Sequence, residues 1–392
     1  MKKIKKGAKM KVTFYSNFLT HHQLPFCMEM VLKYGNDFKF VATIKITEER
    51  LKLGFKNLDD KYDFVVKAYE SKEEYDKALK LAVESDIVIM GSTSDKYIEE
   101  RLKQDKLTFR YRARVFSNGI MTIFDKEKMK LLYERHIKYR KNKNLYMLCA
   151  NAYGANDFYK LGLYKNKIYK WGYFPETKEY NLEQLIKNKE KSKPINIVWV
   201  ARFIKWKHPE KMIKLAKKLV KDGLEFKITM IGTGVMYEKI KEEIHKNNLE
   251  NYVELTGAVE SDKVRDYMEK ANIFILTSGK QEGWGAVLNE AMNSACAVIT
   301  DINVGAAPFL INDSENGLLY KNFEELYMYT KNLIEDNKLR KKLYENAYKT
   351  ILETWNSKNA TNNLINLFES IKDGQEYKIK DGPASKATPI KK

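Results

Sequence analysis

Residues 272–300, NIFILTSGKQEGWGAVLNEAMNSACAVIT, contain a complete strand–loop–helix–strand pattern. The apolar run that ends near Ser278 predicts a buried strand, the apolar spacing from Ala286 predicts a helix, and AVIT predicts the next strand. The loop between strand and helix holds three glycines, which let a backbone come close to a ligand. Ligands of open α/β sheets bind at the carboxyl ends of strands, and a helix N-terminus there offers free N–H groups to a phosphate. This loop is therefore the first candidate binding site.

Two carboxylates frame the glycine loop. Glu282 lies within it, and Glu290 lies about one turn into the following helix. Carboxylates accept hydrogen bonds from hydroxyls, so they suit a sugar and a ribose better than a bare phosphate. The combination of helix amides with flanking carboxylates therefore indicates a sugar nucleotide as the ligand.

A pair of cations follows the strand predicted at 195–201. Arg202 ends that strand, and Lys207 comes just before a helix that opens at Pro209. We expect both cations at the same edge of the sheet as Glu282, where they would stabilise the negative charge of a departing nucleoside diphosphate. Many sugar-nucleotide enzymes use a metal held by an Asp-x-Asp motif for this task, and the sequence contains no such motif. We therefore expect a metal-independent site with no resident cofactor.

The chain is long enough for two domains. Its 392 residues exceed one ordinary core, and both halves alternate short strand patterns with longer helical ones, which predicts parallel sheets in an α/β fold. We expect a first domain at 1–175, a charged linker at 176–194, a second domain at 195–354 and a loose tail at 373–392.

These features resemble family 4 glycosyltransferases, the retaining enzymes of the GT-B architecture, and are similar to bacterial surface-polysaccharide glycosyltransferases. The Glu-x7-Glu hallmark of the family is matched by Glu282 and Glu290, and its Arg-x4-Lys pair is matched by Arg202 and Lys207. The resemblance implies two Rossmann-like, doubly wound domains that face a cleft. It also implies that C-terminal helices cross back, with the one at about 355–372 packing on the first domain.

The resemblance further implies roles for individual residues. Glu282 would contact hydroxyls of the donor sugar, and Glu290 would hold the ribose. Arg202 and Lys207 would hold the diphosphate. Further donor contacts are expected at Gly232, Gly234, Val259, Gly283, Trp284, Gly285, Ala286 and Val287. The Gly-Gly that the family usually carries near the last donor strands is Gly305-Ala306 here, a mild departure.

The first domain offers acceptor-side candidates before its first helix. Asn17 is followed by His21 and His22, an arrangement similar to that of the surface-polysaccharide enzymes. We expect His22 to bind a sugar or to help move a proton. The alternative is that the two histidines only cap the helix.

Three arginines alternate along RYRARVFSNG, residues 110–119. Arg112 is the acceptor-side candidate among them, because guanidinium groups suit an anionic lipid-phosphate acceptor. The alternative is a solvated strand face.

The formal net charge of +19 indicates attraction to an anionic partner. A nucleotide substrate or an anionic membrane surface would fit, and lysine-rich codon usage is the alternative explanation. Nucleic acid is not expected, because no helix-turn-helix, zinc-finger or RNP motif is present. Three scattered cysteines and the lack of any apolar run of bilayer length indicate a cytoplasmic protein, with peripheral contact at the inner face of the membrane left open.

The expected function is that of a retaining hexosyltransferase. It would move a sugar from a UDP- or GDP-type donor to a glycan or lipid-linked acceptor in cell-envelope polysaccharide synthesis. Two alternatives stay open: a sugar-nucleotide epimerase of the same architecture, and a non-catalytic basic protein that binds membranes or nucleic acid. The base, the sugar and the acceptor depend on small pocket contacts that the sequence does not specify.

Overall fold

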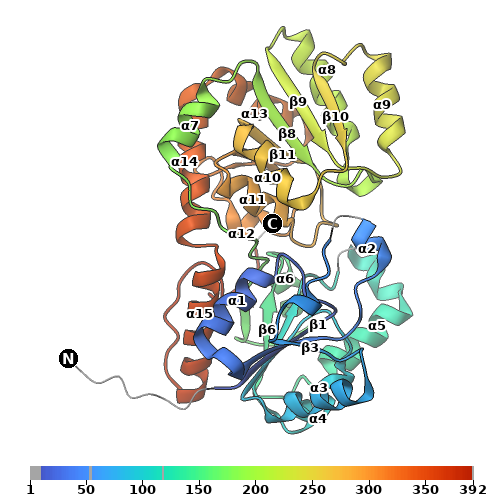
Figure 1. Ribbon diagram of the computed structural model, residues 1–392, viewed down its shortest axis with the longest axis vertical. Coiled ribbons are helices and arrows are strands. Elements are labelled where there is room, and N and C mark those ends of the chain that lie inside the picture. Colours follow the sequence, from blue (N-terminus) through green and yellow to red (C-terminus); the bar gives the residue numbers. More distant parts are fainter. Residues whose placement is uncertain (1–9, 53–54, 117–118, 391–392) are drawn as a thin grey trace, which may run out of the picture. The chain divides into compact units, whose positions relative to one another are not determined.

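The computed structural model describes residues 10–52, 55–116 and 119–390, which form two compact units (Figure 1). Unit 1 combines the chain up to Pro175 with the residues from Ser357 onward, and unit 2 is Glu176–Asn356. The chain therefore leaves unit 1 once and returns to it near its end.

Unit 1 is built on a seven-stranded parallel sheet with the strand order β3-β2-β1-β4-β5-β6-β7. The strands are β1 (Val12–Ser16), β2 (Phe38–Ala42), β3 (Val65–Lys67), β4 (Ile87–Met90), β5 (Thr108–Arg112), β6 (Leu145–Cys149) and β7 (Ile168–Lys170). The helices of its described part are α1 (Leu24–Tyr34), α2 (Glu48–Lys52), α3 (Lys72–Glu84), α4 (Glu99–Lys103), α5 (Lys126–Leu132), α6 (Gly154–Lys160) and α15 (Ser357–Asp373).

Unit 2 is built on a six-stranded parallel sheet with the strand order β10-β9-β8-β11-β12-β13. The strands are β8 (Ile195–Val200), β9 (Phe226–Ile231), β10 (Val253–Gly257), β11 (Ile273–Leu276), β12 (Ala297–Asp301) and β13 (Leu318–Tyr320). The helices are α7 (Leu182–Glu190), α8 (Glu210–Lys221), α9 (Tyr237–Lys246), α10 (Ser261–Lys270), α11 (Ala286–Asn293), α12 (Ala307–Leu310), α13 (Phe323–Glu335) and α14 (Asn337–Glu353).

Both sheets are doubly wound, as predicted. Every residue of the central strands β1, β4 and β11 is buried, because helices cover both faces of each sheet (Figure 1). Strands buried on both faces favour continuous apolar runs over alternation, which is why these strands were easy to predict. The strand order reverses between β1 and β4 in unit 1 and between β8 and β11 in unit 2. Such a reversal opens a crevice at the carboxyl ends of the two strands.

The prediction of a linker at 176–194 is wrong, because this segment is part of unit 2. It contains α7, whose first turn is capped by the Asn181 side chain. Ile186 of this helix is buried, and the ammonium group of Lys189 donates to the carbonyls at the end of α10. The charged composition concealed the helix, since Lys189 buries its stem and satisfies its charge with backbone oxygens.

The prediction of a loose tail at 373–392 is also wrong for the described residues after α15. The chain returns along β7: the amide of Ala384 donates to the carbonyl of Lys170 at 2.7 Å, and the amide of Lys170 donates to Ser385 at 2.7 Å. Ala384, Ser385 and Ala387 are almost fully buried. The tail therefore covers the edge of the sheet. It lacks apolar periodicity because backbone pairing and small side chains hold it in place.

Truncation after Gly374 should destabilise unit 1. It removes the two bonds to Lys170 and the bond from Ala387 to Ile168 at 3.0 Å. At about 1 kcal/mol for each hydrogen bond, the loss should lower the midpoint of thermal unfolding by roughly 6–12 °C. Calorimetry would measure the shift. Truncation after Ile390 is the control and should leave the midpoint unchanged; equal midpoints for the two truncations would contradict the packing role of the tail.

Candidate functional site

The candidate site of unit 2 lies where its strand order reverses. Arg202 and Lys207 follow β8, and Glu282 follows β11, the neighbouring strand. The parallel strands place both loops at one edge of the sheet. The structure thus brings together the cations and the loop carboxylate that the sequence analysis placed there.

Lys207 and Glu282 form an ion pair that joins the two loops. The side chains are 12% and 11% exposed, so the pair is largely withdrawn from water. The Lys207 ammonium also lies 4.3 Å from the centre of the Trp206 ring. Burial lowers the pKa of Lys207, Glu282 offsets part of this effect, and the charge of Arg202 adds to the lowering. An arriving anion would therefore relieve repulsion between two crowded cations.

A buried relay fixes the backbone of Lys207. The indole nitrogen of Trp199 donates to the Thr277 hydroxyl at 2.7 Å, and that hydroxyl donates to the Lys207 carbonyl at 2.6 Å. The sequence analysis missed Thr277, although it ends the apolar run before the glycine loop. The Thr277 hydroxyl, directly after β11, thus connects Trp199 of β8 to the loop that carries Arg202 and Lys207. Thr277 therefore acts as a positioning residue for Lys207.

Arg202 is exposed at the same edge, with its guanidinium 6.0 Å from the centre of the Trp206 ring. Among the described residues, no carboxylate pairs with it. Arg202 is therefore the cation of this site that is open to solvent and to an anionic ligand.

Gly232 and Gly234 have a packing role. Their φ angles are +131° and +152°, and a Cβ on Gly232 would lie 2.1 Å from the carbonyl oxygen of Ala201. This close approach lets Phe203 donate to Thr233 at 2.9 Å. We predicted these glycines as donor contacts; what the structure records is that they hold the loop carrying Arg202 against the end of β9. Val259, the remaining predicted contact of this part of the sheet, is half-buried just after β10.

Gly285 sets the start of α11. It adopts the left-handed conformation with φ +90°, and a Cβ there would meet the Glu282, Leu276 and Val304 side chains at 3.3 Å. No side chain caps the helix that follows. The first-turn residues Ala286 and Val287 therefore present a helix N-terminus with its partial positive charge beside Glu282.

Backbone hydrogen bonds from Gly305 and Ala306 hold the loop that carries Glu282. Gly305 donates to the carbonyl of Glu282 at 3.2 Å, and Ala306 donates to that of Trp284 at 3.1 Å. The Gly305-Ala306 pair thus keeps a supporting position although Ala replaces the second glycine.

The prediction of a donor contact at Trp284 is wrong for its side chain. Its ring is 1% exposed and packs among Phe309 and Trp355, with its nitrogen donating to Asn289 at 2.8 Å. The side chain anchors the loop in the core, because an indole on a short glycine loop gains more by burial than by facing solvent.

Glu290 lies on α11, where it keeps some exposure. Burial raises the pKa of its carboxyl to about 7, and the charge of Arg265 offsets part of the effect. Arg265 donates to Asn293 at 2.6 Å and to the Glu176 carbonyl at 3.3 Å. Sequence reasoning missed both Arg265 and Asn293, which tie α10 and α11 to the start of unit 2.

The candidates of unit 1 follow β1. The His21 and His22 rings are 3.8 Å apart, and His22 stacks on Tyr173 at 5.8 Å. Burial, and then the neighbouring His21, lowers the pKa of His22 to about 3, so its ring is neutral near pH 7. Its Nδ1 is buried without a hydrogen-bond partner among the described residues. Asn17 lies in the same loop, where its carbonyl accepts from the amides of residues 43 and 44.

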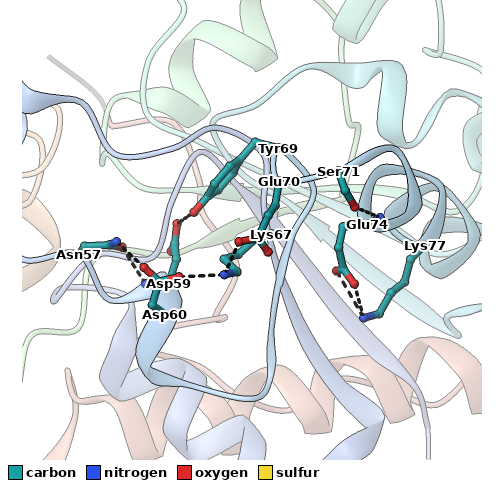
Figure 2. A network of polar contacts seen from close by, with 9 residues as sticks. All are labelled: Asn57, Asp59, Asp60, Lys67, Tyr69, Glu70, Ser71, Glu74 and Lys77. Atoms are coloured by element: carbon teal, nitrogen blue, oxygen red, sulfur yellow. Dashed lines mark hydrogen bonds and ion pairs between the residues drawn. The ribbon is translucent and has the colours of Figure 1, made fainter.

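A polar network that includes Asp59 (Figure 2) is joined to this loop by a hydrogen bond from Leu19. Buried Asp59 accepts from the amide of Leu19 at 2.9 Å and from the Tyr69 hydroxyl at 3.1 Å. Nearby, the ammonium of Lys67 bridges two carboxylates, those of Asp60 and Glu70. The network fixes the backbone just before His21, although Asp59 lies 40 residues further along the chain.

Arg112 ends β5 at the carboxyl edge of the sheet of unit 1. Its neighbours Arg110 and Arg114 are paired with Asp95 and Asp157. Arg110 is 4% exposed, so the alternative of a solvated strand face is wrong for this residue.

The two doubly wound units have the architecture of GT-B glycosyltransferases. Anabaena HepE, crystallised with UDP and glucose, superposes with a TM-score of 0.65 over 92% of this chain and 100% of that chain. The two share 14% sequence identity, so the likeness concerns the fold alone.

Residues 182–350 match the model of the family "Glycosyl transferases group 1". This match lies within unit 2. An uncharacterized glycosyltransferase of Methanocaldococcus jannaschii is 35% identical over 193 residues, 48% of either chain. The poly(glycerol-phosphate) alpha-glucosyltransferase of Bacillus subtilis is 32% identical over 178 residues, 45% of this chain and 26% of that protein. The chain thus spans less than half of the length of these relatives.

The described residues lack a metal-binding cluster and a membrane-spanning helix. No group of three or more His, Cys, Asp or Glu side chains is arranged to hold a metal ion. No helix in this part of the chain has the length and apolar character that a bilayer span requires.

Replacing Glu290 should change how stability depends on pH. A carboxyl whose pKa rises from 4.5 to about 7 on folding costs no stability below pH 4.5, and it costs increasingly more as the pH rises to 7. The cost at pH 8 is at most about 3 kcal/mol. Glu290→Gln removes this titration. The free energy of unfolding of the variant should therefore rise relative to that of the wild type as the pH increases from 5 to 8.

Urea unfolding at four pH values would measure this effect. Glu242→Gln, on the exposed face of α9, is the matched control. If Glu290→Gln and wild-type protein followed parallel curves, the raised pKa would be refuted.

Proposed function

We propose that this protein is a glycosyltransferase that moves a sugar from a nucleoside-diphosphate sugar to a glycan or lipid-linked acceptor. The observation that carries the proposal is the buried Lys207–Glu282 pair beside the uncapped N-terminus of α11, with Arg202 exposed at the same edge. The family match within unit 2 and the names of the relatives support the same activity.

The diphosphate would bind to cations and helix amides. Arg202 offers a fork of donors, and Lys207 offers a point charge on a residue whose backbone carbonyl is fixed by Thr277. As the bond from the sugar to the diphosphate breaks, negative charge grows on the leaving oxygen. Cations already fixed in position stabilise that charge without reorganising, which lowers the barrier.

Glu282 would accept hydrogen bonds from donor-sugar hydroxyls. Its carboxylate has a second oxygen beyond the one that pairs with Lys207. Lys207 therefore has two tasks: it attracts the diphosphate and it orients the carboxylate that recognises the sugar. Glu290, further along α11, would hold the ribose and would do so best when ionised.

The finer features belong to the proposal as well. We infer a UDP donor first and a GDP donor second, because HepE binds UDP. Retention at the sugar carbon and a role in cell-envelope polysaccharide synthesis fit the alpha-glucosyltransferase name of the Bacillus relative. The other roles assigned to Gly283, Val259 and the acceptor-side residues of unit 1 also stay within the proposal, as does a cytoplasmic location at the membrane surface.

Arg202→Gln should abolish most transfer without unfolding the protein. Arg202 is exposed and has no carboxylate partner among the described residues, so its loss should leave the unfolding midpoint unchanged. Losing one preorganised donor at the leaving group should lower kcat/KM by about 100-fold or more. Product formation from UDP- and GDP-sugars, with and without an acceptor, would measure this and would separate transfer from epimerisation.

Lys205→Gln is the matched control, since Lys205 is an exposed cation on the same short turn as Lys207. Full activity in Arg202→Gln would rule out the assigned role. A product formed equally well without any acceptor would favour an epimerase.

Chelation should leave the activity unchanged. Arg202, Lys207 and the amides of α11 supply the positive charge that a metal provides in other sugar-nucleotide enzymes. Transfer rates measured in EDTA should match those measured in added Mg²⁺ within about twofold. A loss restored by Mg²⁺ would show that these cations do not suffice.

A further inference from the structure

Three arginines gather at the carboxyl edge of the sheet of unit 1. Arg110 and Arg112 lie two residues apart on β5, so they share one face of the sheet. Arg135 comes from the helical turn Tyr133–Ile137, which follows α5. The electrostatic effect of Arg135 and Arg110 on Arg112 shows that the three groups are neighbours.

One carboxylate serves two of these arginines. Asp95 binds Arg110 in a bidentate pair at 2.9 and 2.6 Å. The Nε of Arg135 lies 3.9 Å from the same carboxylate, and its Nη2 donates to the Thr93 carbonyl at 3.1 Å. Asp95 is thus already engaged by both groups.

Arg112 has no such partner. Within the described parts of the chain, its guanidinium makes no hydrogen bond and no ion pair. Burial lowers the pKa of Arg112, and the charges of Arg135 and Arg110 lower it further; the weaker opposing effects come from Tyr164 and Asp95. A partly buried cation beside two like charges costs free energy, and among the described residues Tyr164 and Asp95 offset only part of this cost, without a hydrogen bond or ion pair to Arg112.

In the part of the chain that the structure describes, no carboxylate other than Asp95 forms an ion pair with Arg110, Arg112 or Arg135. Burial and the three arginines lower the pKa of His136 well below its usual value, so its ring is neutral near pH 7. Its Nδ1 bonds the Tyr164 hydroxyl at 2.6 Å. Three guanidinium charges and one carboxylate therefore leave a net charge of about +2 in a confined space.

We propose that Arg112, together with Arg135, binds a phosphate group of the acceptor. A guanidinium matches two phosphate oxygens at once, and two guanidinium groups match the charge of a phosphate ester. Arg112 is half-buried at the end of β5, so it is partly accessible to a ligand. The assignment of the phosphate to the acceptor rests on the proposed function, because unit 2 already carries the donor candidates.

A second basic region of unit 1 is the matched comparison. A pocket of about 140 Å³ is lined by residues that include Arg140, Lys165 and Lys167. Arg140 lies close to Arg135 in the sequence and is exposed, so it does not bear the cost that Arg112 bears. Arg140→Gln therefore removes an arginine of the same region without touching the cluster.

The test is direct binding of inorganic phosphate and of glycerol phosphate, followed by ³¹P NMR or calorimetry. All proteins carry Arg202→Gln, which removes the exposed arginine of the candidate donor site in unit 2. The readout thus requires neither a nucleotide sugar nor turnover. Arg112→Gln should weaken binding at least tenfold, Arg140→Gln should not, and glycerol should not bind. Vesicles with and without phosphatidylglycerol form the last arm: a loss in Arg112→Gln confined to vesicles assigns the phosphate to a lipid headgroup, and a loss with glycerol phosphate assigns it to a water-soluble ester.

Stability is the second readout. A residue kept for binding should be dispensable for folding, so Arg112→Gln should unfold at the same temperature as its parent or a higher one. A fall of more than about 5 °C would indicate a structural role and overturn the proposal. Arg112→Lys keeps the charge, loses the fork, and should bind with intermediate affinity.

Binding that is unchanged in Arg112→Gln both for the soluble phosphates and on phosphatidylglycerol vesicles, or a parent that binds neither, would also overturn the proposal. Failure of the proposed function would appear elsewhere, as wild-type protein that binds no nucleotide sugar.

Discussion

The buried ion pair between Lys207 and Glu282 joins the loops that follow two neighbouring strands of unit 2. Withdrawing two charges from water is costly, and each group tolerates burial because the other is present. Three neighbouring contacts position this pair. Thr277 donates to the backbone carbonyl of Lys207, the lack of a Cβ at Gly285 leaves space for the Glu282 side chain, and the amide of Gly305 donates to the Glu282 carbonyl. The ion pair holds the two loops of the site together, because separating the charges would leave each one buried without a partner.

The two units treat charge in opposite ways. In unit 2 the central cation is matched by a carboxylate of the same chain, and the second cation stays exposed. In unit 1 the shared carboxylate Asp95 leaves Arg112 unmatched at the edge of its sheet. An ion pair within the chain holds a loop in place. An unpaired, partly buried cation lowers the stability of the fold, and a bound anion would offset that cost. This difference is consistent with one unit that orients a donor and another that selects an acceptor.

How far the sequence predicted the molecule depended on the range of the interactions. The central strands and the loop from Gly279 to Gly285 follow from local patterns, so the sheet order reversal and the convergence of Arg202, Lys207 and Glu282 could be expected. Trp284 could not be placed, because its burial depends on Phe309 and Trp355 far along the chain. Residues 384–387 pair with β7 through backbone hydrogen bonds, and the amide of Leu19 donates to the Asp59 carboxylate. Both contacts join distant segments and leave no periodic signal.

The pairing of the last described residues with β7 has a consequence for synthesis on the ribosome. Unit 1 is composed of the first and last parts of the chain, with the whole of unit 2 between them. Unit 2 can complete its sheet as soon as Asn356 has emerged, while unit 1 still lacks α15 and the strip that seals its open edge. Unit 2 can therefore complete its fold before unit 1, although most of unit 1 precedes it in the chain. This reverses the usual N-to-C order of domain folding. Until residues 384–387 have emerged, β7 remains an exposed edge.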